Sequence, residues 1–149
     1  GQVVLSLTEE DRRVSIVVGY IPTREGRAAL RRAAVECELR RVPLLVINSQ
    51  ANGKLYDELD TTRFESSLDE VRARLADAGV TVEVRQLVRG KEPAEDLIEV
   101  ADSSHAELIV IGLRRRTPVG KLILGSNAQR ILLDATCPVL AVKASPEDD

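Results

Sequence analysis

The stretch Leu108-Ile109-Val110-Ile111-Gly112 is a run of four large apolar residues that ends in a glycine. A strand that is apolar without alternation is buried on both faces, as in a parallel sheet covered by helices on both sides. The segment before it, 93–104, has a proline in its first turn and predicts a helix. Residues 125–134, beyond a basic loop, predict another helix. The run therefore lies inside a strand–helix alternation, which indicates an α/β domain.

The same alternation extends through the rest of the chain. Further strands are predicted at 14–18, 44–47, 80–88 and 138–142, and further helices at 23–41 and 62–78, with a loop at 48–60. This order predicts parallel strands joined by right-handed crossovers, in an open sheet with helices on both faces. A length of 149 residues predicts a single domain. We expect residues 1–13 and 144–149 to be its flexible ends.

The composition excludes several classes of function. A net charge of −3 and a total of three aromatic residues argue against nucleic-acid binding, which needs a basic surface and stacking platforms. The sequence contains no apolar run of membrane-spanning length and no signal-peptide pattern. Two distant cysteines and one histidine form neither a disulfide framework nor a metal site of ordinary spacing. We therefore expect a cytoplasmic protein without a membrane or nucleic-acid partner.

The residues that follow the apolar strand indicate a phosphate site. Gly112 ends the strand, a basic loop with Arg114 and Arg115 follows, and Gly125-Ser126 opens the next helix. A glycine allows a ligand to approach the backbone, and a helix N-terminus offers free N–H groups and partial positive charge. The Ser126 hydroxyl either caps the helix or donates to a phosphate oxygen. In an open α/β sheet, such a loop lies where ligands bind.

From Gly112 onward, the sequence resembles the C-terminal signature of the universal stress protein family. That signature is a glycine, two residues, a second glycine, nine residues, and a glycine followed by Ser or Thr. Gly112, Gly125 and Ser126 match it. Two further segments resemble the family: Cys137-Pro138-Val139-Leu140-Ala141-Val142 and Ile16-Val17-Val18-Gly19, the latter leading to Gly26-Arg27-Ala28-Ala29-Leu30. The resemblance covers nearly the whole chain after Arg13.

The resemblance implies a five-stranded parallel sheet of order 3-2-1-4-5 and a regulator of stress survival rather than a dedicated enzyme. It also implies a homodimer, in which the edge strand pairs with its copy through Val139, Leu140, Ala141 and Val142. Some members bind ATP between the first and fourth strands, and others bind no nucleotide. We expect an ATP or AMP site with no catalytic or metal-ligating residue, and a requirement for Mg²⁺ stays open. The alternative is a dimeric interaction module that acts through a protein partner.

The resemblance also places the nucleotide on particular residues. Its phosphates would contact Gly112, Gly125, Ser126 and the Asn127 backbone, with Arg114 or Arg115 assisting, and its nucleoside would lie near Ile21, Pro22 and the Val46 backbone. Ile21 replaces an Asp of nucleotide-binding members, and the lost hydrogen bond costs on the order of 1–3 kcal/mol. Arg115 replaces the middle glycine, which costs about 1–2 kcal/mol if the backbone is left-handed but adds charge for a phosphate. The alternatives are a core valine at Val46 and a solvated basic loop.

Other candidate residues have structural interpretations. Asp102-Ser103-Ser104-His105 contains the residue types of a catalytic triad, but consecutive residues at a helix end do not form one. Glu95 and Asp96 lie in a first helical turn, where carboxylates complement the helix dipole. Cys137 is expected to be a small buried residue, and Cys37 either a packing residue or an exposed thiol.

Overall fold

The computed structural model describes residues 14–49, 56–87, 91–115, 122–145 and 148. Its elements are β1 (Ser15–Gly19), α2 (Arg24–Arg40), β2 (Leu44–Ser49), α3 (Glu58–Asp77), β3 (Val82–Leu87), α4 (Pro93–Ser103), β4 (Ala106–Arg115), β5 (Leu122–Ile123), α5 (Ser126–Asp134) and β6 (Val139–Lys143). Within the described ranges, no helix has the length and apolar character needed to cross a membrane.

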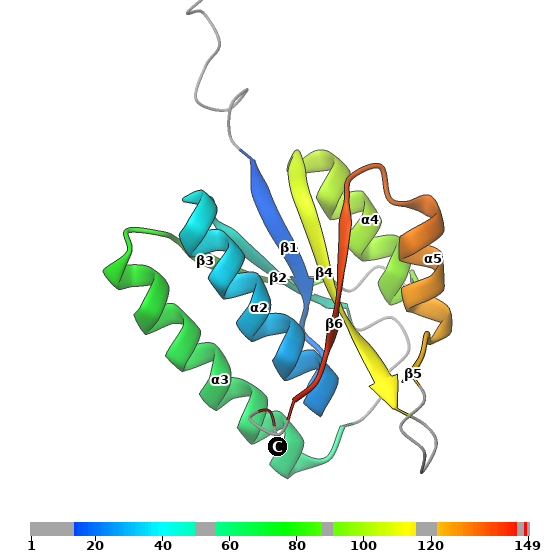
Figure 1. Cartoon of the computed structure of the whole chain (residues 1–149), viewed down its shortest axis with the longest axis horizontal. Coiled ribbons are helices and arrows are strands. Elements are labelled where there is room, and N and C mark those ends of the chain that lie inside the picture. Colours follow the sequence, from blue (N-terminus) through cyan, green and yellow to red (C-terminus); the bar gives the residue numbers. More distant parts are fainter. Residues whose placement is uncertain (1–13, 50–55, 88–90, 116–121, 146–147, 149) are drawn as a thin grey trace, which may run out of the picture.

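The main sheet is parallel and doubly wound (Figure 1). Its strands lie in the order β3-β2-β1-β4-β6, and each neighbouring pair is parallel. Because β6 is the fifth of the strands predicted from the sequence, the expected order 3-2-1-4-5 is confirmed. The chain winds outward from β1 to β3 and then returns to the other side of β1 as β4. The strand order therefore reverses between β1 and β4.

Helices cover both faces of this sheet, with α2 and α3 on one face and α4 and α5 on the other (Figure 1). Successive strand residues point to opposite faces, so Ile16 and Val18 pack under α2 and α3 while Val17 packs under α4 and α5. All three are at most 1% exposed. This two-sided burial explains the uninterrupted apolar runs of β1 and β4.

Two predicted boundaries were wrong. The helix expected at 62 begins at Glu58, because the Asp57 carboxylate accepts a hydrogen bond from the Leu59 N–H at 2.7 Å and caps it. The loop expected after Gly112 is partly a hairpin, since β4 continues to Arg115 and pairs antiparallel with β5. The remainder of that loop, 116–121, lies outside the described residues. So does the N-terminal end expected for 1–13.

The expected frayed C-terminal end also requires correction where it is described. Ser145 and Asp148 lie against α2, and Asp148 is only 7% exposed. Arginines of α2 hold them in place, through long-range contacts that local sequence patterns do not report.

Candidate functional site

The carboxyl ends of β1 and β4 form the position where open α/β sheets bind ligands, because their connections leave toward opposite faces. Val18 pairs with Val110 just before these ends. After β1, Ile21 is 40% exposed and Pro22 is buried. The Ile21 side chain folds back over Gly19, with its Cδ1 at 3.1 Å from where a Cβ would stand. An apolar side chain thus lines this edge, at the position where the resemblance indicated that Ile21 replaces an Asp.

Gly112 is required by helix packing. A Cβ built on it would lie 2.4 Å from the carbonyl oxygen of Glu25, in the first turn of α2. No side chain fits at that distance, so β4 and α2 can approach only if residue 112 is glycine. The sequence interpretation explained Gly112 by the approach of a ligand and did not identify the packing of α2 against it.

The start of α5 is polar and uncapped by any side chain. Gly125 is its N-cap, with extended backbone (φ −71°, ψ 167°) and no side-chain hydrogen bond. The first N–H groups of a helix have no partner inside the helix. Ser126 is exposed, and its hydroxyl bonds to no other residue in the part of the chain that the structure describes. The capping role left open for Ser126 is therefore not observed, because Gly125 holds the cap position.

Asn127 joins the starts of two helices. Its Oδ1 accepts a hydrogen bond from the Ala94 N–H of α4 at 3.2 Å. Arg130 of α5 pairs with Glu95 of α4 at 2.8 Å and reinforces the contact. Two helix N-termini, each with partial positive charge, consequently lie side by side at the carboxyl edge of the sheet. The Asn127 Oδ1 is engaged in this contact, and the expected ligand contact through the Asn127 backbone stays a prediction.

Arg114 lies on the hairpin at the same edge, where it pairs with Ile123. It also lies near Tyr56, which precedes α3. Burial raises the pKa of the Tyr56 phenol, and the nearby Arg114 guanidinium opposes part of that rise. A cation and a half-buried aromatic ring thus approach each other beside the candidate site. The side chain of Arg115 lies outside the described part of the chain.

Val46 lies farther inside the sheet than predicted. It is fully buried, and its backbone pairs with Val18 on one side and Val84 on the other. Strand β2 continues to Ser49, so Val46 is not at the strand end. The structure favours the interpretation as an ordinary core valine.

Asp96 is a buried polar residue that the sequence interpretation missed. It is 0% exposed, and its Oδ2 accepts a hydrogen bond from the Ser49 hydroxyl at 2.5 Å. This bond joins the end of β2 to the first turn of α4, so the residue does more than complement a helix dipole. The signal was its spacing, because Asp96 lies four positions before Val100 on the apolar face of α4.

The remaining candidate residues do not form a catalytic or metal-binding site in the described part of the chain. Cys37 is a packing residue, and burial, aided by Glu107 and Glu36, raises the pKa of its thiol to about 12. Cys137 is half-buried and packs beside α4 and α5. The Asp102 carboxylate accepts a hydrogen bond from the Thr136 hydroxyl at 2.6 Å, and the bond from His105 to Asp102 is made by the backbone N–H and carbonyl at 3.3 Å, so the described contacts do not form a triad. In the described ranges, no group of three or more His, Cys, Asp or Glu could hold a metal.

A doubly wound parallel sheet with polar helix starts at its reversal point is a Rossmann-like α/β architecture of the kind that binds nucleotides. Residues 14–143 match the model of the Universal stress protein family. The chain belongs to this family.

Individual relatives agree with this assignment. The chain is 48% identical over 130 residues to a universal stress protein of Mycolicibacterium smegmatis, covering 86% of this chain and 96% of that one. It is similar to the structure of the universal stress protein from Archaeoglobus fulgidus in complex with dAMP, with 33% identity, a TM-score of 0.64, and 87% and 98% of the two chains covered. It is also similar to a universal stress protein in complex with cAMP, with 25% identity, a TM-score of 0.62, and 89% and 98% covered.

Proposed function

We propose that this protein is a stress-response regulator that binds an adenine nucleotide at the carboxyl edge between β1 and β4. The observation that carries the proposal is the start of α5, where the Ser126 hydroxyl and the first helix N–H groups bond to no other described residue and lie beside the N-terminus of α4. The similar proteins solved with dAMP and cAMP support an adenine nucleotide. Two free cysteines fit a reducing, cytoplasmic location.

In this proposal, the phosphates contact Ser126 and the backbone of Gly125 and Asn127, and Arg114 supplies positive charge. The nucleoside lies toward Ile21 and Pro22. The protein binds the nucleotide without converting it to a product as part of its function, and any hydrolysis is incidental. The contribution of Mg²⁺ to nucleotide affinity is measured by ATP titrations with and without the ion.

The Ser126→Ala variant tests the phosphate position. We expect it to weaken ATP binding about tenfold, because loss of one hydrogen bond to a charged group costs roughly 1.5 kcal/mol. Its Tm should match that of the wild type, since the hydroxyl bonds to no other described residue. Titration calorimetry of ATP and AMP, after removal of any co-purified nucleotide, gives the affinities.

Ser66→Ala is the matched control, because Ser66 is an exposed serine on α3, away from the site. It should bind ATP as the wild type does. Equal affinity of Ser126→Ala and the wild type would remove the Ser126 hydroxyl from the phosphate site.

The second candidate is an interaction module that binds no nucleotide. The position of Ile21 favours it, since this apolar side chain covers Gly19 where binding members have a carboxylate. Absence of binding at millimolar ATP would contradict the first function and favour this one.

We also propose that β6 pairs with its copy in a homodimer. In the described part of the chain, β6 hydrogen-bonds only to β4, and its residues Val139 to Val142 are partly or largely exposed. Beside it, α5 exposes Leu133 at 83% and Leu132 at 42%.

Sedimentation should give about twice the chain mass of 16.3 kDa. An Ala141→Lys variant, which places a charge on this edge, should sediment as a monomer; a wild-type mass near that of one chain would contradict the dimer.

A further inference from the structure

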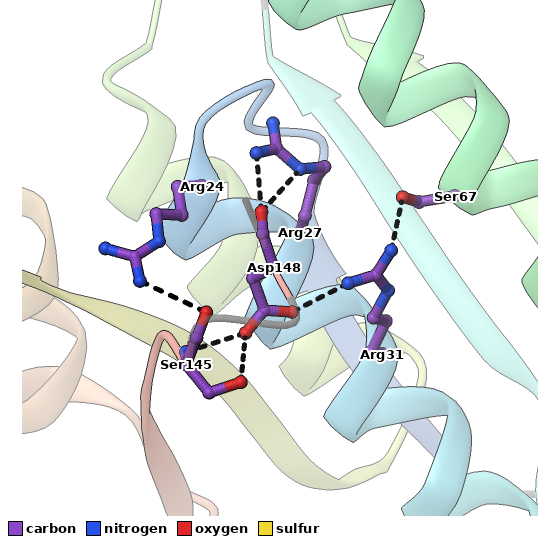
Figure 2. Close-up of polar contacts among 6 residues, drawn as sticks. All are labelled: Arg24, Arg27, Arg31, Ser67, Ser145 and Asp148. Atoms are coloured by element: carbon purple, nitrogen blue, oxygen red, sulfur yellow. Dashed lines mark hydrogen bonds and ion pairs between the residues drawn. The ribbon is translucent and has the colours of Figure 1, made fainter.

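Three arginines on one face of α2 surround the C-terminal turn of the chain. Arg24, Arg27 and Arg31 are spaced by three and four residues, so they lie on the same side of the helix. Figure 2 shows their guanidinium groups around Ser145 and Asp148. The turn borders a groove of about 520 Å³ between α2, α3 and the end of β6, so solvent reaches it from one side.

Arg27 is the buried member of this cluster. It is 4% exposed, and its Nε and Nη2 both donate to the main-chain carbonyl oxygen of Asp148, at 3.2 and 2.7 Å. Its Nη1 is also buried and has no hydrogen-bond partner among the described residues. A permanently charged group removed from water is costly unless it is paired. Without the turn, the other two donors of Arg27 would lose their acceptor as well.

The other two arginines hold the two ends of the turn. Arg31 Nη1 donates to the Asp148 carboxylate at 2.9 Å, and Arg24 Nη2 donates to the Ser145 carbonyl at 3.1 Å. Burial raises the pKa of the Asp148 carboxyl group. The Ser145 N–H, Arg31 and the Ser145 hydroxyl together lower this pKa by more than burial raises it, so the net shift is downward. The carboxylate therefore stays charged, and paired with Arg31, at neutral pH.

The turn is closed by its own hydrogen bonds. The Asp148 carboxylate accepts from the N–H and the hydroxyl of Ser145, at 2.8 and 3.2 Å, and the Asp148 N–H donates to the Ser145 carbonyl at 2.9 Å. This is a Ser-x-x-Asp turn with the side-chain-to-backbone bond of a capping box. Together, Ser145 and Asp148 present two carbonyls and one carboxylate oxygen to the arginines.

The turn and the candidate site meet through the first turn of α2. Arg24, which binds the turn, is followed by Glu25, whose carbonyl oxygen is packed against Gly112 of β4. Displacement of Ser145 and Asp148 would take the acceptor from Nε and Nη2 of Arg27 and the partners from Arg24 and Arg31, so these side chains would turn toward water and release the first turn of α2. That movement would open the contact with Gly112 of β4, three residues before the strand ends beside the proposed site.

We propose that Ser145 and Asp148 form an intramolecular latch whose engagement by Arg24, Arg27 and Arg31 fixes the first turn of α2 and raises the affinity of the nucleotide site. The effect on affinity rests on the proposed function. The fixing of α2 does not, because it follows from the contacts of the three arginines with Ser145 and Asp148.

The test compares Asp148→Ala and Arg31→Ala, which remove the ion pair, with Arg32→Ala. Arg32 is the neighbouring arginine on α2, and it pairs with Glu36 at 2.8 Å rather than with the turn. Hydrogen exchange is followed at the Gly26 and Arg27 amides, which donate to Thr23 Oγ1 and the Thr23 carbonyl at 3.0 and 2.9 Å. We expect exchange about tenfold faster in the two latch variants and unchanged in Arg32→Ala.

ATP affinity is then measured on the same proteins, and we expect it to fall about fivefold in the two latch variants alone. Unchanged exchange would overturn the latch. Faster exchange with unchanged affinity would overturn its effect on the site. Failure of the wild type to bind ATP would overturn the proposed function and the regulation with it, while the exchange data would still decide whether the turn fixes α2.

Discussion

The Gly26→Ala protein is expected to melt roughly 6–12 °C below the wild type, which corresponds to a loss of about 3 kcal/mol or more. A Cβ at residue 26 would lie 1.8 Å from the carbonyl oxygen of Ile21 and 2.8 Å from its carbonyl carbon. That oxygen also accepts the Thr23 N–H at 2.7 Å, so the obstacle is backbone held in a tight turn. The new methyl group would force this turn away from the start of α2.

Alanine in a helix interior normally stabilises relative to glycine by up to about 1 kcal/mol, so the expected sign is opposite to helix propensity. Gly125→Ala is the matched control, because a Cβ there meets nothing within 4 Å and the backbone is extended. Its cost should stay within about 1 kcal/mol, as for loss of a good N-cap residue. Thermal unfolding by circular dichroism distinguishes the two variants. A Gly26→Ala protein as stable as the Gly125→Ala protein would contradict the close packing around Ile21.

The sheet could be predicted from the sequence because burial leaves a direct pattern along the chain. Strands β1, β2 and β4 are covered on both faces, and each is a continuous apolar run. Strand β3, at the edge, alternates as expected. The positions of the helices along the sequence were then constrained by the strands on either side of them. The strand order was predicted from the family resemblance.

The site was predicted less completely, because its details depend on contacts between distant residues. Gly112 and Ser126 were identified from local spacing, but the partner of Gly112 is Glu25 on α2, which no local pattern reports. The burial of Asp96 depends on Ser49 of another strand. Asp148 is held by arginines far away in the chain, and an acidic terminal segment read alone predicts a solvated end.

The Gly112→Ala variant separates the two explanations for the glycine at position 112 of β4. A Cβ at residue 112 would lie 2.4 Å from the Glu25 carbonyl oxygen and 2.9 Å from the Glu25 Cβ. Strand β4 is held between β1 and β6, so it cannot shift to relieve this overlap. We expect a loss of about 2–3 kcal/mol, measured as the free energy of unfolding in urea on nucleotide-free protein.

The nucleotide-free condition makes the result decisive. If Gly112 were glycine only so that a phosphate could approach, alanine would weaken ATP binding and leave the stability of the free protein within about 0.5 kcal/mol of the wild type. If packing requires it, as the Glu25 contact indicates, stability falls before any ligand is added. Because the same contact fixes the start of α2 at the edge of the site, a weaker affinity would then follow from the displaced helix. In that case Gly112 positions the binding loop through α2, and the phosphate contacts belong to the start of α5.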